Sequence, residues 1–541
     1  MTRFADNNDD QLCNFIIRVL SVDEIYEDEE SKPDIYVEFC FSFGESAVAD
    51  EPIYRVLVKD IDNMHWKTID LRCCYNLKIK EKMIEKSLSQ HVRQSLTAVP
   101  KKQIYRFNRT GMYEIKGRPV YCTGVDVIRG QEFASDILFE VAPMVHKLDI
   151  DVDLPEEEAA TEFFRLLTLS PNPARLILAY KLGFFMRLAY EKIGKIPKGC
   201  IYLYGQSGTQ KTTFTSFLTQ TNDRSNGIKS PSRLNASIPA AVKMLLENFS
   251  DVVVMDDLYP ADSNRQRNQQ EDVLIEITRY IADGTVPTKM KGNELLQGYP
   301  RCGVIFTGEY LIGKGSDAAR LLPVEMEKPD IKELQYFQKH PLIVSTFYRY
   351  FIIWFIDHYD LICDTLAQMM ESYENLALNV HDRLREMYFF LGSSYFLFLQ
   401  YLYDKKILTE LDARRLFQSF NSLLLLLIKQ QNERVTGEQP EMNNAKNHLQ
   451  QIRMLYKSGQ LSIAKDTLTF DKDRHDGLLY RNKLYLRGNK ISVYFPESSI
   501  NEIADSLVKQ GALEIGKVSR TKQISRLKGL RFYVIPLSKL Q

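Results

Sequence analysis

The chain has 541 residues, of which 44% are hydrophobic, so it can bury a sizeable core in roughly three or four domains of ~100–200 residues each. Its 70 lysines and arginines balance 70 aspartates and glutamates, and its eight cysteines have neither C-x-x-C nor zinc-site spacing. We therefore expect reduced, mostly buried thiols in a cytoplasmic protein. The polar N-terminus does not resemble a signal peptide, and the most apolar runs, 341–357 and 387–403, fall short of an uninterrupted ~20-residue membrane span. Both runs are expected to be buried helices, and no membrane contact is predicted.

The balanced total hides a gradient of charge along the chain. Residues 1–60 hold 5 lysines and arginines against 15 aspartates and glutamates, whereas residues 445–541 hold 18 against 8. The net charges of the acidic head and the basic end differ by more than ordinary solvated surfaces usually do. The basic end is therefore a candidate for binding a phosphate backbone.

The residue patterns predict five regions in chain order. Strands dominate 12–125, where "DIYVEFCFSF" and "PIYRVLVKDI" are β-rich, one helix is expected at about 80–97, and hairpin turns fall at 109–111 and 116–117. Pro155 and three following glutamates mark a helix start, and 155–195 reads as two or three helices. The predicted regions are a β-rich N-terminal domain with the acidic head (1–130), a helical linker (131–198), an α/β core (199–330), a helical lid (331–435) and a basic C-terminal domain (445–541).

The stretch "YLYGQSGTQKTTF" (202–214) has the features of a phosphate-binding loop. An apolar strand runs into a glycine-containing loop and then into a helix, the context that such a loop requires. Lys211 is predicted to reach the β and γ phosphates of ATP, and Thr212 to offer its hydroxyl to Mg²⁺. The usual motif, G-x-x-x-x-G-K-[ST], has glycine where this chain has Gln210. The predicted ATP-binding residues are Gly205, Gln206, Ser207, Gly208, Thr209, Gln210, Lys211, Thr212 and Thr213.

A second element follows in "DVVVMDDLYP" (251–260), an apolar strand that ends in two carboxylates, as a Walker B strand does. Asp256 is predicted to join Thr212 in holding Mg²⁺, and Asp257 to orient or deprotonate the attacking water. Each motif alone is moderate evidence. Their occurrence together and in this order is strong evidence for a nucleotide site.

Two further segments complete the predicted catalytic set. The buried strand in "RCGVIFTGEY" (301–310) ends near Thr307 and Glu309, where a polar side chain can position water. "GKGSDAARLLPVEM" (313–326) then places Arg320 where it can reach the γ-phosphate on a neighbouring subunit, as an arginine finger does. The alternative for Arg320 is a surface arginine or a structural ion pair.

This order of motifs resembles AAA+ ATPases. The loop "GQSGTQKT" is similar to the MCM replicative-helicase variant, which also lacks glycine before the lysine, and "IADGTVPTKMKGNELLQGYP" (281–300) resembles the presensor-1 β-hairpin of MCM and superfamily-3 helicases. The whole layout most resembles the MCM-like Cch/Rep helicases of staphylococcal cassette chromosomes and pathogenicity islands. That resemblance implies ATP and Mg²⁺ as cofactors, DNA as partner and a homo-oligomer, with a hexamer expected. Walker B in the family ends in Asp-Glu, whereas this chain has Asp256-Asp257. Because aspartate is one methylene shorter than glutamate, either Asp257 or Glu309 is expected to position the water.

Two elements are predicted to bind DNA. Lys289 and Lys291 are expected at the turn of the hairpin, where they would grip a single strand in a ring's pore; an ordinary charged turn is the alternative. The segment 496–516 has helical spacing, and the following residues predict two strands around a basic loop, the pattern of a winged helix that binds duplex DNA. Protein contact is the alternative for the wing. Its predicted DNA contacts are Lys517, Arg520, Lys522, Arg526 and Lys528.

The sequence therefore favours an AAA+ ATPase fold with a β-rich N-terminal domain, helical linker and lid regions, and a C-terminal winged helix. Its predicted function is that of a ring-forming DNA helicase that replicates a mobile genetic element. One alternative is a replication initiator that uses ATP as a switch and does not unwind DNA. A STAND-like signalling NTPase is another.

Overall fold

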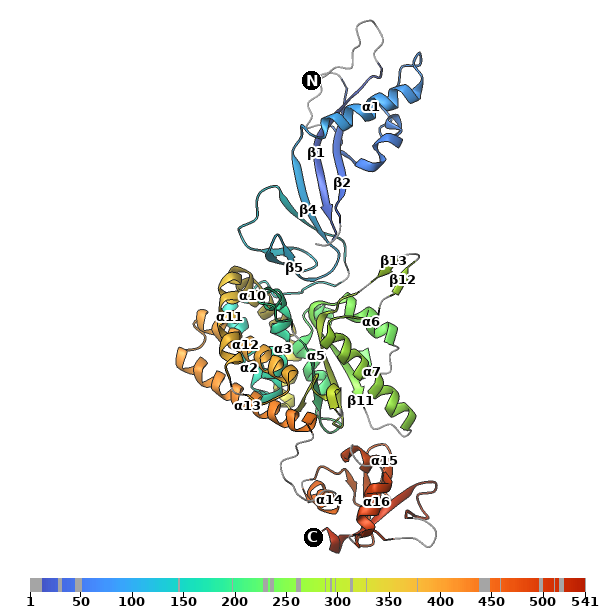
Figure 1. The fold of residues 1–541 in the computed structure, drawn as a ribbon, viewed down its shortest axis with the longest axis vertical. Coiled ribbons are helices and arrows are strands. Elements are labelled where there is room, and N and C mark those ends of the chain that lie inside the picture. The colour runs from blue at the N-terminus through green and yellow to red at the C-terminus, as the bar shows by residue number, and fades with distance from the viewer. Residues whose placement is uncertain are drawn as a thin grey trace. The chain divides into compact units, whose positions relative to one another are not determined.

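The computed structural model divides the chain into two compact units, Met1–Lys147 and Leu148–Gln541 (Figure 1). The described residues are 12–27, 32–43, 51–144, 146–196, 198–226, 232–233, 238–258, 264–287, 289–291, 294–296, 298–311, 315–326, 328–376, 378–436, 448–457, 459–495, 500–509, 511–514 and 520–540. Both units are α/β structures, and each is described by itself.

The first unit is built on a five-stranded sheet in the order β3-β2-β1-β4-β8. Its elements are β1 (Ile16–Tyr26), β2 (Asp34–Ser42), β3 (Tyr54–Leu57), two 3₁₀ helices (Val58–Asn63 and Trp66–Thr68), α1 (Glu81–Ser95), β4 (Lys101–Phe107) and β8 (Ile137–Val141). Helix α1 confirms the helix predicted at about 80–97. The second half of "PIYRVLVKDI" is a 3₁₀ helix instead of strand, because Ile61 is buried there and its carbonyl accepts a hydrogen bond from Ser89 of α1.

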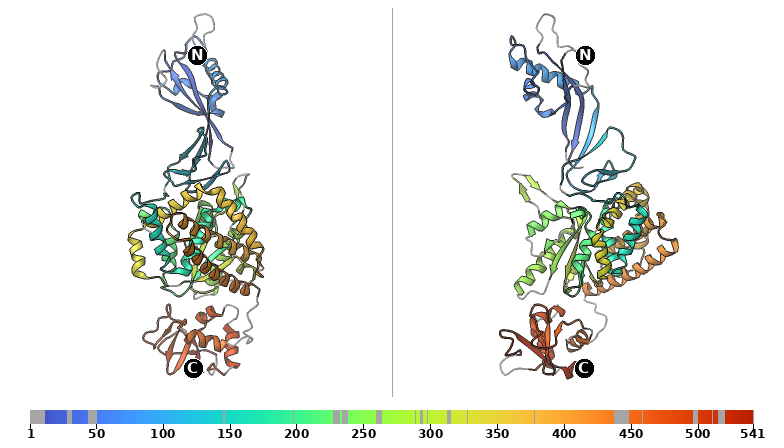
Figure 2. Two further views of the ribbon diagram at one scale, coloured as in Figure 1. Left: turned by 90° about the vertical axis from the view of Figure 1, so that its left-hand side faces the viewer. Right: turned by 180° about the vertical axis from the view of Figure 1, so that it is seen from behind.

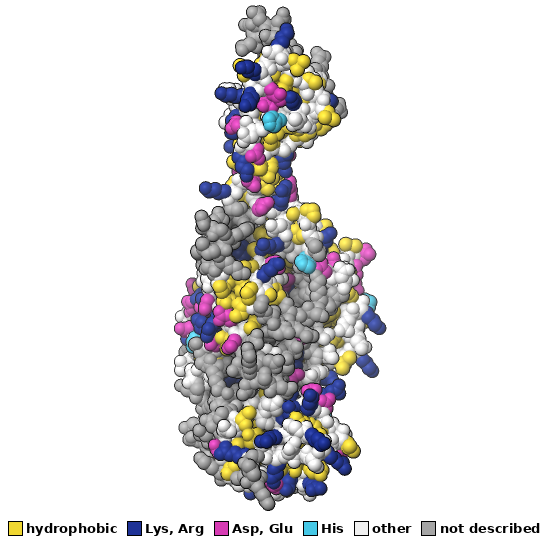
Figure 3. All heavy atoms as spheres, turned by 90° about the vertical axis from the view of Figure 1, so that its right-hand side faces the viewer, with side chains coloured by type: hydrophobic (Ala, Val, Ile, Leu, Met, Phe, Trp, Pro, Cys, Tyr) yellow, Lys and Arg dark blue, Asp and Glu magenta, His cyan; other side chains and the backbone are white. Residues whose placement is uncertain are grey.

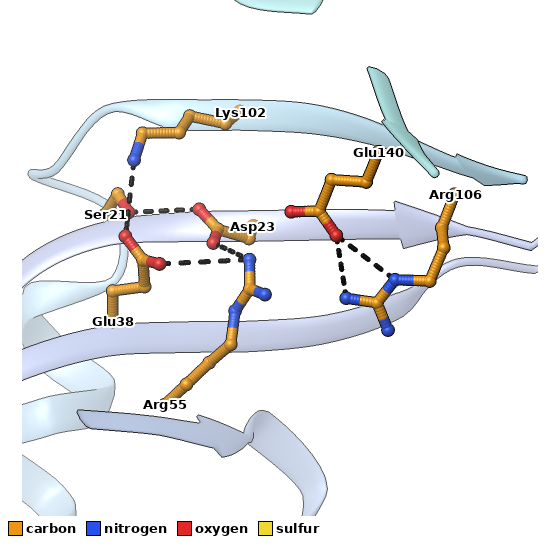
Figure 4. Close-up of polar contacts among 7 residues, drawn as sticks. All are labelled: Ser21, Asp23, Glu38, Arg55, Lys102, Arg106 and Glu140. Atoms are coloured by element: carbon orange, nitrogen blue, oxygen red, sulfur yellow. Dashed lines mark hydrogen bonds and ion pairs between the residues drawn. The ribbon is translucent and has the colours of Figure 1, made fainter. Parts of the chain in front are cut away.

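The two faces of this sheet differ in chemistry. One face packs against α1 through a core that contains Phe39, Phe41 and Trp66. On the other face, Figure 4 shows charged side chains lying across neighbouring strands. Asp23 of β1 is buried and pairs with Arg55 of β3. The remaining contacts join Ser21 to Asp23, Glu38 to Ser21, Arg55 and Lys102, and Arg106 to Glu140. Opposite charges offset one another on this face, which is therefore not a basic surface.

The rest of the first unit is a small antiparallel sheet of β5 (Gly111–Ile115), β6 (Arg118–Cys122) and β7 (Val127–Arg129). The predicted turn at 116–117 joins β5 and β6, with positive φ angles at Lys116 (51°) and Gly117 (75°), as a tight hairpin turn requires. Strand β8 then returns to pair with β4. The unit therefore extends beyond residue 130, and the first part of the range predicted to be helical is a strand.

The centre of the second unit is a fully parallel sheet in the order β10-β11-β14-β9-β15. Helices α3 and α5 pack on one face, and α6 and α7 on the other (Figures 1 and 2). The elements of this part of the chain are β9 (Cys200–Tyr204), α5 (Lys211–Thr219), the 3₁₀ helix Arg224–Asn226, β10 (Ser232–Arg233), α6 (Ile238–Glu247), β11 (Phe249–Leu258), α7 (Asn264–Asp283), β12 (Lys289–Lys291), β13 (Glu294–Leu296), β14 (Arg301–Gly308), α8 (Gly315–Ala318) and β15 (Leu321–Glu325), of which β12 and β13 form a separate two-stranded sheet. The predicted alternation of strand and helix over 199–325 is confirmed.

Helices that precede and follow the sheet in sequence pack together at its side. They are α2 (Glu156–Leu167), α3 (Pro171–Phe185), α4 (Arg187–Lys192), α9 (Ile331–Lys339), α10 (Leu342–Asp357), α11 (Tyr359–Glu374), α12 (Asp382–Asp404) and α13 (Glu410–Thr436). Contacts such as α2 with α10 and α3 with α12 join the two sets. The predicted helices in 155–195 and 331–435 are confirmed, but they form one helical body.

The two most apolar runs lie in α10 and α12, and their large side chains are mostly buried in this body. In the described part of the chain, no helix is both long and apolar enough to cross a membrane. All eight cysteines are free, and only Cys74 is exposed, as expected for reduced thiols.

The basic C-terminal region folds around its own mixed sheet, in the order β16-β17-β18-β20-β19. Its elements are α14 (His448–Lys457), β16 (Ile463–Ala464), β17 (Gly477–Tyr480), β18 (Lys483–Arg487), α15 (Gly488–Ile491), the 3₁₀ helix Ser492–Tyr494, α16 (Ile500–Lys509), β19 (Lys522–Gln523), β20 (Arg531–Pro536) and the 3₁₀ helix Leu537–Lys539. The predicted helix is α16, whose Ile503 and Leu507 are buried. Strand β19 lies inside the stretch predicted to be a basic loop, because it pairs with β20.

Candidate functional site

The predicted phosphate loop lies between β9 and α5. Strand β9 is buried between β14 and β15 in the parallel sheet, and α5 begins at Lys211, so the amide groups of its first turn face the loop. Gly205 and Gly208 have φ angles of 157° and 84°. Glycine is suited to such angles because it has no Cβ, so the loop can turn tightly before the helix.

Gln210 occupies the position where the usual motif has glycine. Its backbone is left-handed, with φ 61° and ψ 22°, and its side chain makes no capping hydrogen bond. A residue with a Cβ pays about 1–2 kcal/mol for this conformation. The loop therefore keeps the backbone geometry for which glycine is favoured, although the sequence departs from the motif.

Lys211 is buried inside the loop. Its Nζ donates to the carbonyl oxygens of Gly205 (2.8 Å) and Gln206 (2.9 Å). Burial lowers the pKa of Lys211, whereas the carboxylates of Glu309 and Asp256 act to raise it. The ammonium group thus lies where loop carbonyls hold it, with two carboxylates close enough to influence it.

Three predicted residues from three segments meet beside this lysine. Thr212 of α5 donates through Oγ1 to Oδ1 of Asp256 on β11 at 2.5 Å. Thr307 of β14 donates to the same Asp256 oxygen and lies 3.4 Å from the Thr212 hydroxyl. Strand β14 lies between β9 and β11, which explains why its end reaches both. Hydroxyl and carboxylate oxygens are the ligands that Mg²⁺ prefers, so Thr212 and Asp256 fit the predicted metal role.

The end of β11 is irregular at the predicted carboxylates. Met255 pairs with Phe306 and Leu258 with Gly308, so three steps along β11 match two along β14. This extra residue is a β-bulge, which redirects side chains and is common beside active sites. Asp257 lies within the bulge, and its side chain is outside the described residues.

Glu309 follows β14 directly, and its N–H donates to the carbonyl oxygen of Leu258 at 2.9 Å. Its carboxylate is near enough to Lys211 to affect the lysine pKa. Glu309 therefore belongs to the group at the loop.

Arg320 lies elsewhere, directly before edge strand β15. Its carbonyl oxygen accepts a hydrogen bond from the first residue of β9, Cys200 (2.8 Å), whereas the phosphate loop follows the last residue of β9. Because the strands are parallel, Arg320 and Lys211 lie at opposite ends of β9, about 16 Å of strand apart. The Arg320 side chain is 11% exposed and pairs with Asp317 and Asp283 of its own chain.

The predicted hairpin is present, with β12 paired antiparallel to β13 (Figure 1). The prediction placed Lys289 and Lys291 at the turn, but both lie on β12. Lys289 is opposite Leu296 and Lys291 is opposite Glu294. Met290 is opposite Leu295 between them. The side chains of both lysines are outside the described residues.

Figure 3 shows lysines and arginines spread over one face of the C-terminal region. Two of the predicted DNA contacts are already in ion pairs: Arg520 lies 2.5 Å from Asp505, and Lys522 lies 2.7 Å from Glu514. Arg526 and Lys528 are exposed in the turn before β20. The fifth predicted contact, Lys517, is outside the described residues.

Sequence reasoning missed two features at the loop. Gly308 lies at the end of β14, where a Cβ would approach the Tyr202 hydroxyl to 2.2 Å; an isolated glycine in a strand is the signal that marks such a close approach. The amide of Gln206 donates to the carbonyl oxygens of Gly459 (3.4 Å) and Gln460 (3.2 Å), so the C-terminal region contacts the phosphate loop. No sequence motif predicts this second contact.

The strand, loop and helix, with a lysine, two hydroxyls and two carboxylates converging on them, form an arrangement that can hold a phosphate group together with a divalent cation. No protein-family model matches the chain, and no curated protein matches it.

Among solved structures, the chain is similar to one described as "SCCmec type IV Cch - active helicase", with 12% identity, a TM-score of 0.48 and coverage of 98% of this chain and 95% of that one. A structure of the NrS-1 C-terminal region has 11% identity, a TM-score of 0.26 and coverage of 96% of each chain. A structure of NrS-1 residues 305–718 has 12% identity, a TM-score of 0.23 and coverage of 77% of this chain and 87% of that one. All three TM-scores lie below 0.5.

Proposed function

We propose that this chain is an ATP-dependent, ring-forming DNA helicase with an MCM-like AAA+ core, which serves the replication of a mobile genetic element. The observation that carries the proposal is the convergence of Thr212, Asp256 and Thr307 beside the loop that ends in Lys211. These groups come from a helix and two strands that are far apart in sequence. Together with a helix N-terminus, they supply the ligands that a phosphate–Mg²⁺ complex needs.

The proposed roles follow from the positions of the groups. Lys211 exchanges its loop carbonyls for phosphate oxygens, while Thr212 and Asp256 hold the Mg²⁺. Thr307 orients Asp256 and, with Asp257 or Glu309, positions the attacking water. When bound, MgATP supplies the phosphoryl group that is transferred to water, and the residues act by position and charge.

The position of Arg320 supports hydrolysis between subunits. At the opposite end of β9 from Lys211, Arg320 is too far away to act on the nucleotide of its own chain. A closed ring would bring it to the loop of a second copy, where its positive charge would stabilise the γ-phosphate during transfer. Each active site would then need two subunits.

The proposed DNA contacts divide into two kinds. The hairpin β12–β13, with Lys289 and Lys291 on its first strand, would hold a single strand in the pore. The C-terminal region, with Arg526 and Lys528 exposed, would bind duplex DNA as a winged helix. Deleting 445–541 should lower duplex affinity, and the log–log salt slope should flatten by about 0.9 per lost phosphate contact.

The test is strand displacement on forks that carry either a 3′ or a 5′ tail, with Lys211→Ala as the inactive control. The intact chain should unwind one type of fork with ATP, and the variant should unwind neither. If DNA stimulates ATP hydrolysis but no fork is unwound, a replication initiator that uses ATP as a switch would be favoured. If DNA does not change the rate of ATP hydrolysis, a signalling NTPase would be favoured.

Sharing of the site between subunits has its own test. Arg320→Ala should bind nucleotide but lose turnover, and mixing it with Lys211→Ala should restore some activity, because one type of mixed interface has both intact elements. No recovery in mixtures that are shown to assemble together would contradict the proposed role of Arg320.

A further inference from the structure

A network of ion pairs surrounds Arg320 and has no role in the proposed site. Its members come from α7, from α8, from the residue before β15 and from the start of α12. Arg320 donates through Nη1 to Asp317 and through Nη2 to Asp283, each at 3.3 Å. Asp317 also accepts two hydrogen bonds of 3.0 Å from Arg279, and Asp283 lies 3.6 Å from Arg383. Three arginines therefore share two aspartates.

The sharing is unequal. Arg279 holds Asp317 in a bidentate arrangement, which is the strong form of this interaction, whereas Arg320 makes one longer bond to each aspartate. If the Arg320 side chain turned away, Asp317 would keep Arg279 and Asp283 would keep Arg383. No carboxylate would be left without a partner if Arg320 withdrew.

The backbone of Arg320, in contrast, is fixed. Its carbonyl oxygen accepts from Cys200 at 2.8 Å, and a Cβ on the adjacent Gly199 would approach that oxygen to 2.9 Å. The side chain is only 11% exposed while it is docked between the aspartates. A fixed backbone with a releasable side chain is the arrangement that a group needs if it alternates between two partners.

Asp283 connects this network to the hairpin. It is the last residue of α7, and Gly284 follows with a φ angle of 70°. The N–H of Val286 donates to the carbonyl oxygen of Gly298 at 3.3 Å and closes the base of the segment that holds β12 and β13. A change at Asp283 therefore acts within three residues of the hairpin base.

We propose that Asp283 and Asp317 are positioning residues that dock Arg320 in its own chain, and that Arg320 leaves them when it binds the γ-phosphate held by a second copy. This inference rests on the proposed function and deepens it. Withdrawal of Arg320 leaves Asp283 paired with Arg383 alone, at the point where α7 joins the hairpin. Nucleotide binding at one interface is thereby linked to the position of the hairpin.

The experiment uses the full chain, with Asp283→Asn as the test and Arg383→Gln as the matched control. Asp283→Asn removes the charge that holds Arg320, whereas Arg383→Gln removes the other partner of Asp283 and leaves the Arg320 contact. Assembly is followed by sedimentation with a non-hydrolysable ATP analogue, and coupling is followed as strands displaced per ATP hydrolysed.

Asp283→Asn should lower the protein concentration for half-maximal assembly by about two- to fivefold, the range expected for one partly exposed ion pair. It should also lower the number of strands displaced per ATP. Arg383→Gln should change the logarithm of the protein concentration for half-maximal assembly by less than half as much as Asp283→Asn does. In an Arg320→Ala background, Asp283→Asn should no longer shift assembly. Asp317→Asn is a second test of the dock and should shift assembly in the same direction.

Two results would overturn the inference, and they differ from each other. Suppose that Arg320→Ala abolishes turnover but Asp283→Asn shifts assembly equally with and without Arg320. The proposed docking of Arg320 by Asp283 is then wrong, while the proposed function stands. If Arg320→Ala leaves turnover unchanged, the trans role of Arg320 fails, and the dock fails with it.

Discussion

The left-handed backbone of Gln210 leads to a prediction that departs from the usual effect of glycine. Replacing another residue by glycine normally weakens a protein, because glycine has more freedom to lose on folding. Here Gln210 has φ 61° and ψ 22° at the N-terminus of α5, where glycine is the residue with least strain. We expect Gln210→Gly to leave the core equally stable or more stable.

The magnitude follows from two opposing effects. Removing the Cβ relieves about 1–2 kcal/mol of backbone strain. Glycine's greater freedom in the unfolded chain costs ~0.4–1 kcal/mol in return. The net change is a gain of between ~0 and ~1.6 kcal/mol. Gln210 makes no capping hydrogen bond, so no cap is lost. Gln210→Ala is the matched control, because alanine keeps the Cβ and hence the strain.

The assay is thermal and urea unfolding of the nucleotide-free protein, together with MgATP affinity for each variant. Gln210→Gly should be at least as stable as the parent, and Gln210→Ala should lie within about 0.5 kcal/mol of the parent. Both variants should still bind MgATP, because the loop backbone keeps its conformation. If Gln210→Gly is clearly less stable than Gln210→Ala, the left-handed conformation at this position is refuted.

Three further predictions concern other parts of the chain. Gly308→Ala places a methyl group 2.2 Å from the Tyr202 hydroxyl and should cost about 1–3 kcal/mol, and adding Tyr202→Phe should recover part of that loss in unfolding measurements. Lys289→Ala combined with Lys291→Ala should abolish strand displacement while ATP hydrolysis persists; normal unwinding by this variant would refute the pore role. The pKa of Glu514 is lowered by hydrogen bonds from two lysines, so its stabilisation is present above its unfolded pKa and is lost as the pH falls through the folded pKa. Glu514→Gln should therefore flatten the acid side of the stability profile of the C-terminal region, and an unchanged profile would contradict this.

The sequence alone determined the local features of the core. Spacing and composition predicted β9, the loop, α5, the apolar part of β11 and the strand β14, because each depends on short-range patterns of apolar, glycine and polar residues. They also predicted the helices of 155–195 and 331–435. The hairpin was expected from the resemblance of 281–300 to a presensor-1 β-hairpin. Lys211, Thr212, Asp256 and Thr307 became candidate site residues because phosphate and Mg²⁺ chemistry requires those residue types at strand and helix ends.

Only the tertiary structure decided which of these groups meet. The parallel pairing of β9, β14 and β11 brings Thr212, Thr307 and Asp256 together and sends Arg320 to the far end of β9, since direction and strand order arise from pairing between distant segments. The bulge at Asp256 and Asp257 depends on the register against β14, which no local pattern encodes. The left-handed backbone of Gln210 is held by the strand and helix on either side of it, and those surroundings override the preference of glutamine itself.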